Sequence, residues 1–206
     1  MPIWGLCASW PIPQKDLSIF LVSSNRKKLA EIARYGLDLD LRPIEDLPEI
    51  DGTPDQVAIH KAMAAGAGAV VEDTILFVAG QPWVDVRWNL EKVQAHAGEL
   101  SVWRTTLAHN DGQSIRLYVG EVQGRLVPAH QVRPDAFGFD PWFRPDGYDL
   151  SLDELEVAGR KDEVSARRRA VQALLAQQPT LVVPIDQVAT WEGAWQGEGA
   201  KNSPTP

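Results

Sequence analysis

The amino-acid sequence predicts an α/β fold built on a mixed β-sheet, on three observations. An apolar run over residues 17–22 ends at Ser23-Ser24-Asn25, which is typical of a buried strand that leads into a helix. Strand and helix patterns continue to alternate early in the chain. Farther along, two apolar segments flank Asp111-Gly112, a strong signal for an antiparallel hairpin. Alternating elements favour parallel strands and a hairpin adds antiparallel ones, so we expect a mixed sheet flanked by helices.

Local patterns place the first elements in order. Residues 25–35 carry apolar side chains at helical spacing, and Gly36 follows as a natural helix stop. Residues 37–42 alternate leucine with charged side chains, which predicts a half-exposed strand. A capping-box pattern at Thr53 opens an alanine-rich helix over residues 54–65.

The later elements follow from the same kinds of pattern. Two apolar stretches, residues 69–71 and 75–78, are interrupted by three polar residues. Residues 102–108 and 115–127 are the arms of the predicted hairpin, and residues 162–177 predict a second long helix.

The domain organisation expected from these elements is simple. One domain spans residues 17–178, with an N-terminal extension over residues 1–16 and a C-terminal extension over residues 179–206. Glycine, serine and proline are frequent from Trp191 onward, so we expect the end of the chain to be flexible.

Composition limits the classes of function. Hydrophobic residues make up 44% of the 206 positions and charged residues 23%, which is ordinary for a globular chain with a real core. The formal net charge is -8, and an acidic chain repels a polyphosphate backbone, so long nucleic acid is not an expected partner. No apolar run approaches the roughly 20 residues of a membrane helix. The N-terminus lacks the basic and apolar regions of a signal peptide, so we expect a cytoplasmic protein without membrane contact.

The residue types also limit the metal ion that the chain can bind. Cys7 is the only cysteine, so there is neither a disulfide framework nor a thiolate cluster, and the four histidines show no metal-ligand spacing. Any metal ion should therefore be hard and bound through oxygen.

The junction at residues 23–28 is the first candidate site. Ser23, Ser24 and Asn25 stand where a strand leads into a helix, and free N–H groups at such a point favour an anion. Lys28, one turn into the helix, adds a full positive charge. Plain helix capping followed by solvated lysines explains the same pattern, and both interpretations stay open.

Carboxylates supply the second group of candidates. Glu72 and Asp73 lie inside an apolar stretch, where adjacent carboxylates are costly to bury without a cation or metal ion; a polar break between two strands is the alternative. Glu49 lies in a loop between apolar neighbours. Lys61 lies at the polar edge of the alanine-rich helix, where a snorkelling surface lysine is the plain interpretation.

An aromatic segment and a basic segment complete the candidates. Phe137-Gly138-Phe139-Asp140 suits stacking on a flat base, although a turn that plugs the core fits as well. Lys161 and Ser165 are expected to share one helix face at i, i+4. Of the three consecutive arginines that begin at Arg167, at most one should point inward.

Together these segments resemble the inosine triphosphate pyrophosphatase family, enzymes that clear non-standard purine nucleoside triphosphates. The similarity covers approximately residues 17–176, and its motifs stand in order with family-like spacing. They are Ser23-x-Asn25-x-x-Lys28-x-x-Glu31, Leu47-Pro48-Glu49-Ile50, Lys61, Val71-Glu72-Asp73-Thr74, Arg87-Trp88-x-Leu90-Glu91-Lys92, Phe137-Gly138-Phe139-Asp140-Pro141 and Ser165-Ala166-Arg167. Several motifs in register argue against a chance likeness.

The resemblance implies an elongated mixed sheet in two lobes, with a nucleotide cleft between them, and a homodimer. It also implies hydrolysis of a nucleoside triphosphate to the monophosphate and pyrophosphate with Mg²⁺, or Mn²⁺. Glu49, Asp73 and Glu72 would bind the metal ion, and Asp73 and Lys61 would be catalytic. The residues that would hold the substrate are Ser23, Ser24, Asn25, Lys28, Lys61, Thr74, Arg87, Phe137, Gly138, Phe139, Asp140, Lys161, Ser165 and Arg167.

Three departures from the family pattern affect the base side more than the phosphate side. Ala166 stands where the family has histidine, Trp83 where it has a small glycine, and Ser24 where its phosphate loop has glycine. Three functions remain. One is a housekeeping hydrolase of inosine or xanthosine triphosphate, and the second, favoured by Ala166 and Trp83, is the same reaction on another or modified nucleotide. The third is a nucleotide-binding protein with lost or altered catalysis, against which the retained carboxylates and lysines argue.

Overall fold

A mixed β-sheet forms the centre of the molecule. The structure, a computed structural model, describes residues 19–23, 25–42, 47, 49–83, 90–129 and 132–196. Within these residues the sheet has eight strands, in the main order β2-β1-β3-β5-β6-β7, with β4 paired to β3 and β8 to β6. The strands are β1 Phe20–Val22, β2 Asp40–Arg42, β3 Ala69–Val78, β4 Gln81–Trp83, β5 Leu100–Asn110, β6 Ser114–Leu126, β7 Phe143–Pro145 and β8 Leu181–Pro184. β1 pairs in parallel with β2 and β3, and the other pairs are antiparallel.

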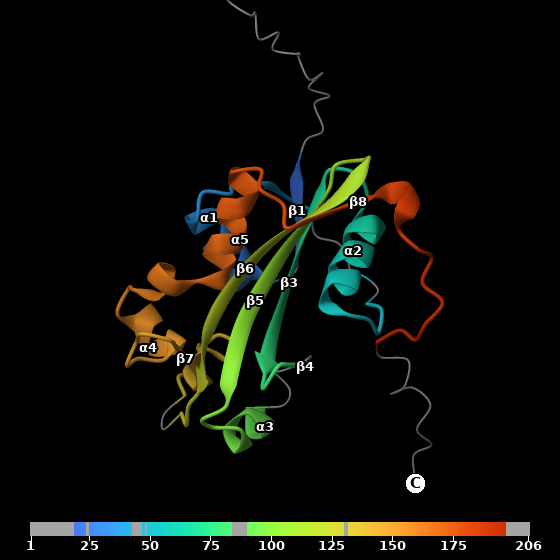
Figure 1. Cartoon of the computed structure of the whole chain (residues 1–206). Helices are drawn as coiled ribbons and strands as arrows, with labels where there is room; N and C mark the ends of the chain where they lie inside the picture. Colours follow the sequence, from blue (N-terminus) through green and yellow to red (C-terminus); the bar gives the residue numbers. More distant parts are fainter. Residues whose placement is uncertain are drawn as a thin grey trace, which may run out of the picture.

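Helices cover both faces of the sheet, as Figure 1 shows. They are α1 Arg26–Arg34, α2 Pro54–Ala65, α3 Leu90–Ala95, α4 Leu152–Val157 and α5 Ala166–Leu175. α1 and α5 pack on one face around Ile32, Tyr118 and Val171, while α2 packs on the other around Ala58, Ala62 and Val71. The predicted α/β fold, an elongated mixed sheet flanked by helices, is confirmed.

Strand β3 passes through the predicted interruption without a break. Glu72, Asp73 and Thr74 pair in register with β5, so the polar residues belong to the strand and do not end it. The alternative of a polar break between two strands is therefore wrong, because the backbone hydrogen bonds continue through the polar residues. The parallel neighbour β1 ends at Val22, opposite Val71. The carboxylates thus begin just past the end of the parallel strand, where open α/β sheets place their ligands.

The helix starts depend on side-chain caps. The Asn25 side chain accepts from the backbone N–H groups of Lys27 and Lys28, and Thr53 opens α2 with the predicted capping box. The second long helix is shorter than predicted. Lys161–Val164 is a 3₁₀ turn, and Ser165 caps α5 by accepting from the N–H of Arg168. Lys161 and Ser165 therefore do not share a helix face.

The strand expected over residues 37–42 is also shorter than predicted. Only Asp40–Arg42 forms β2, and all three residues are exposed because β2 is the edge strand beside β1. Leu37 is instead buried against α1 and α5. Alternation alone did not reveal that the chain turns inward before the strand begins.

The end of the described chain returns to the α2 face. β8 pairs antiparallel with residues Ser114 to Leu117 of β6, and the chain then runs along the outer side of α2, drawn in red in Figure 1. It ends beside Ile50, which forms an isolated bridge with Trp195. Among the described helices, none has the length and apolar character needed to cross a membrane.

Candidate active site

Strand β3 divides the predicted site residues between the two faces of the sheet. Successive side chains of a strand point to opposite faces. Asp73 therefore points toward α2, whereas Glu72 and Thr74 point toward α1 and α5. The structure gives the two adjacent carboxylates separate surroundings, and only Asp73 lies beside Glu49.

On the α2 face, Lys61 joins two carboxylates. Its Nζ lies 2.7 Å from Glu49 Oε1 and 2.9 Å from Asp73 Oδ1. Burial disfavours the charged form of Lys61, but Asp73 and Glu49 outweigh this and raise its pKa. Lys61 is therefore a fixed positive charge and not a proton acceptor.

The same two carboxylates suit a hard divalent cation. They come from different segments and converge on one ammonium group, so the position between them already favours positive charge. Oxygen donors are what Mg²⁺ prefers, and it is commonly bound through one or two carboxylates together with substrate phosphates. In the part of the chain that the structure describes, no group of three or more His, Cys, Asp or Glu side chains is placed to hold a metal ion.

The start of α1 presents the expected polar groups. Ser23 Oγ accepts from the N–H of Asn25 at 3.1 Å, and Asn25 Oδ1 accepts from the N–H groups of Lys27 and Lys28. The ammonium of Lys28 reaches across to β3 and forms an ion pair with Glu72. Ser24 lies outside the described residues, as does Arg87.

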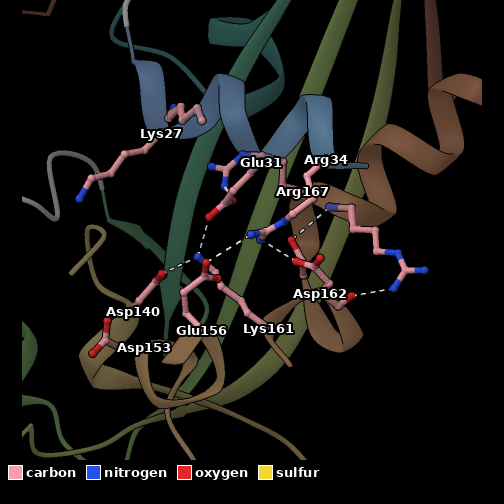
Figure 2. Close-up of polar contacts among 12 residues, drawn as sticks. Lys27, Glu31, Arg34, Asp140, Asp153, Glu156, Lys161, Asp162 and Arg167 are labelled. Carbon is pink, nitrogen blue, oxygen red and sulfur yellow. Dashed lines mark hydrogen bonds and ion pairs between the residues drawn. The ribbon is translucent and has the colours of Figure 1, made fainter. Parts of the chain in front are cut away.

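On the opposite face, the 3₁₀ turn Lys161–Val164 and the first turn of α5 each bring one buried cation against the carboxylates. Lys161 Nζ lies 2.7 Å from Glu31 Oε1 and 2.6 Å from Asp140 Oδ2. Arg167 donates to Glu72 at 3.0 Å and also pairs with Glu31. Figure 2 shows Glu31, Asp140, Lys161 and Arg167 pointing toward one another below α1. As the sequence predicts, only one of the three consecutive arginines is buried.

A glycine allows α5 to lie this close to the sheet. A Cβ at Gly120 of β6 would lie 2.0 Å from the carbonyl oxygen of Ala166, so only glycine fits there. The close approach sets the first turn of α5 over β6 and β5, and from there the Arg167 side chain reaches Glu72 of β3. Ala166 itself is fully buried in the core cluster that contains Trp103 and Phe143.

We call these six buried or half-buried charged residues the charge network: Lys28, Glu31, Glu72, Asp140, Lys161 and Arg167. Burial opposes the charge on Glu72, but Lys28 and Arg167 outweigh it and hold its pKa at about 2. For Asp140 burial prevails over the attraction of Lys161 and raises the pKa to about 6. Asp140 therefore takes up a proton in mildly acid solution, whereas Glu72 keeps its charge there.

The aromatic segment contains one half-buried ring and one buried ring. Phe137 is half-buried, and its ring centroid lies 5.4 Å from Lys161 Nζ and 5.5 Å from Arg167 Cζ. Phe139 is 8% exposed and packs in the core beside Trp103 and Phe143. Gly138 between them has φ +54°, which lets the chain turn the two rings to different surroundings.

The sequence patterns did not identify two contributors to the candidate site, one on each face of the sheet. The Trp103 ring lies 5.8 Å from Lys161 Nζ and 6.0 Å from Arg167 Cζ. Its only signal was a place in the apolar alternation of β5, which core residues share. The other contributor is the segment from Trp191 to Gln196, which contacts the loop that carries Glu49.

The site residues fall within the part of the chain that matches a known family. The model of the Ham1 family matches residues 19–177. The chain belongs to the Ham1 family. Ham1 proteins are generally nucleoside triphosphate pyrophosphatases that act on nucleotides and use a divalent metal ion, so the resemblance to inosine triphosphate pyrophosphatases is confirmed.

Solved structures of Ham1 proteins have the same fold. A HAM1 protein from Coxiella burnetii is 24% identical with a TM-score of 0.54, and the alignment covers 77% of this chain and 96% of that one. The Ham1 protein of Staphylococcus aureus is 22% identical with a TM-score of 0.59, with the same two coverages, 77% and 96%.

Proposed function

We propose that the chain hydrolyses a nucleoside triphosphate to the monophosphate and pyrophosphate with Mg²⁺. The observation that carries the proposal is the convergence of Glu49 and Asp73 on one cationic position, next to the lysine of α2. Two carboxylates against one ammonium leave an excess negative charge that would attract a divalent cation, and a bound cation would in turn attract a triphosphate. Mn²⁺ has the same preference for oxygen ligands and is the expected substitute.

The residues of the α2 face would carry the reaction. Glu49 and Asp73 hold the metal ion, which when bound neutralises phosphate charge and lowers the pKa of coordinated water. Asp73 accepts the proton of the water whose oxygen attacks the α-phosphorus. The bond from that phosphorus to the bridging oxygen breaks, and pyrophosphate leaves with the electron pair. Lys61 would bind the phosphate oxygens from this face, and Lys28 of α1 would bind them from the other.

The residues of the opposite face would bind the base. Phe137 offers a half-buried ring for stacking, and Lys161 and Arg167 beside it can donate to a carbonyl oxygen on the base edge. Glu72 and Thr74 orient Arg167 and are not proposed as contacts to the metal ion. A 6-oxo purine fits these donors.

A specific observation favours a substrate other than inosine or xanthosine triphosphate. Ala166 is fully buried and offers the base neither a ring nor a hydrogen bond. A site that lacks one polar partner discriminates less between bases that differ by one donor or acceptor. The second candidate function is therefore the same hydrolysis of another or modified nucleotide. We further propose a homodimer, as the family resemblance implies, and a place in the cytoplasm, as the sequence pattern at the N-terminus predicts.

Product analysis with labelled water tests the reaction. Purified protein with Mg²⁺ should release pyrophosphate from inosine triphosphate, and EDTA should stop the release. In water enriched in ¹⁸O, attack on the α-phosphorus puts the label in the monophosphate and leaves the pyrophosphate unlabelled. Release of orthophosphate, label in the pyrophosphate, or full activity with EDTA would contradict the mechanism. Tight nucleotide binding without turnover would point to a binding protein.

A further inference from the structure

The chain beyond the family match packs on the α2 face. The family model ends at residue 177, and the chain continues as β8 on the edge of β6. Val183, Ile185 and Val188 then pack against the core cluster that contains residues of α2. This segment therefore covers the helix that carries Lys61.

Farther along, the segment binds the loop that carries Glu49. The N–H of Gln196 donates to the carbonyl oxygen of Glu49 at 2.8 Å, and the N–H of Asp51 donates to the carbonyl oxygen of Ala194 at 2.9 Å. The side-chain Nε2 of Gln196 donates to the carbonyl oxygen of Ile50 at 3.0 Å. Three consecutive residues of the loop are thus held by hydrogen bonds from one segment, which we call the clasp (residues 191–196).

Trp191 anchors the clasp. Its Nε1 donates to the carbonyl oxygen of Ala194 at 2.9 Å, and its ring lies edge-on to His60 of α2 with centroids 6.0 Å apart. A Cβ at Gly52 would lie 3.3 Å from the indole, so the ring also packs on the turn before α2. A Cβ at Gly193 would lie 2.6 Å from the same indole, which leaves room for glycine only.

We infer that the clasp positions Glu49 for metal binding. The Glu49 side chain is 42% exposed, and its described side-chain partner is Lys61 on another element. A solvated carboxylate on a loop loses its position when the backbone below it moves, and the clasp fixes that backbone. Trp191, Gly193 and Gln196 are therefore positioning residues, which act on the metal ion through Glu49. The inference rests on the proposed metal role of Glu49.

Direct Mn²⁺ binding by the full chain tests the inference without relying on activity. In Trp191→Ala, Mn²⁺ affinity measured by electron paramagnetic resonance should fall about 10-fold, as for other supports of metal ligands. The amides of Asp51 and Gln196 should exchange with deuterium faster, while the β3 and β5 amides keep their protection. Val182→Thr in β8 is the matched control, because it is exposed in the same extension but outside the clasp. It should leave both measurements unchanged.

A second variant covers the case in which Trp191→Ala does not fold. Gly193→Ala keeps the indole and adds only a Cβ that collides with it, so the same loss of Mn²⁺ affinity is expected. Mn²⁺ affinity equal to that of the parent in a folded clasp variant overturns the inference, even if the Asp51 amide exchanges faster. So does a parent chain that binds no Mn²⁺.

Kinetics separate this inference from the proposed function. If the parent releases pyrophosphate, excess Mg²⁺ should restore the kcat of Trp191→Ala, which a general loss of structure would not allow. A kcat that stays low at saturating Mg²⁺ contradicts a positioning role. If the parent releases no pyrophosphate, the proposed function fails, and the Mn²⁺ and exchange measurements still decide whether the clasp holds a cation site.

Discussion

The two faces of the central sheet hold their charges differently. On the α1 and α5 face, the charge network pairs three cations (Lys28, Lys161 and Arg167) with three carboxylates (Glu31, Glu72 and Asp140). On the α2 face, two carboxylates face the single ammonium of Lys61, and the Glu49 side chain is 42% exposed. One group is balanced and largely buried; the other is negative, and its Glu49 side chain is open to water.

The difference indicates what each face can accept. Buried charges are tolerated only when each has a partner, so a balanced network fixes its side chains and presents donors in a set geometry. An unbalanced group near solvent gains most from an added cation. We therefore propose that the α5 face recognises the base and that the α2 face binds the metal ion and carries the attack on the phosphate, with Lys28 reaching the phosphate from α1.

The largest expected effect is a difference in stability between variants of the two faces. Arg167→Met leaves Glu31 and Glu72 buried without their shared cation, so the free energy of unfolding should fall by about 3–5 kcal/mol. Lys61→Met leaves carboxylates that water can reach, so the loss should be at most about 1 kcal/mol. Urea denaturation of both variants in one buffer measures this. Equal losses in the free energy of unfolding would mean that water reaches the carboxylates of the α2 face no better than those of the charge network.

A smaller effect is expected in the pH dependence of stability. The pKa of Asp140 is raised from 3.8 to about 6 by burial, so between these values the folded chain keeps a proton that the unfolded chain has released. Stability from this group is therefore present below pH 3.8 and is lost as the pH rises to about 6. Asp140→Asn does not titrate, so the parent should lose stability relative to it across that window. A difference that is constant with pH would show Asp140 to be ionised throughout.

Much of the fold could be predicted from the sequence because local patterns suffice for it. The capping box at Thr53, the cap at Asn25 and the turn at Asp111-Gly112 each specify an element within a few residues. The errors occur where contacts with residues far away in the sequence determine the local structure. Leu37 turns inward to meet α5, and Ser165 ends a 3₁₀ turn where the periodicity predicts helix.

The sequence predicts candidate site residues but not how the sheet divides them between its faces. The motifs name Glu72 and Asp73 together, and only the strand register shows that they serve opposite faces. Trp103 has no polar signal in the sequence, and the clasp lies in a glycine-rich segment in which no local pattern predicts a contact with Ile50. Contacts between segments so far apart in the chain follow from topology, which local patterns do not contain.

Pyrophosphate release by Asp73→Asn across a panel of nucleotides tests the division of the two faces most directly. The panel compares kcat/KM for inosine, xanthosine, guanosine, adenosine and pyrimidine triphosphates with Mg²⁺. The variant keeps the shape of Asp73 but loses the proton acceptor, so kcat/KM should fall about 100-fold or more. Because Asp73 faces away from the base side, the fall should be the same for every base, and the order of preference should be retained. Near-parental rates, or a changed order of preference, would contradict the assignment of chemistry to the α2 face.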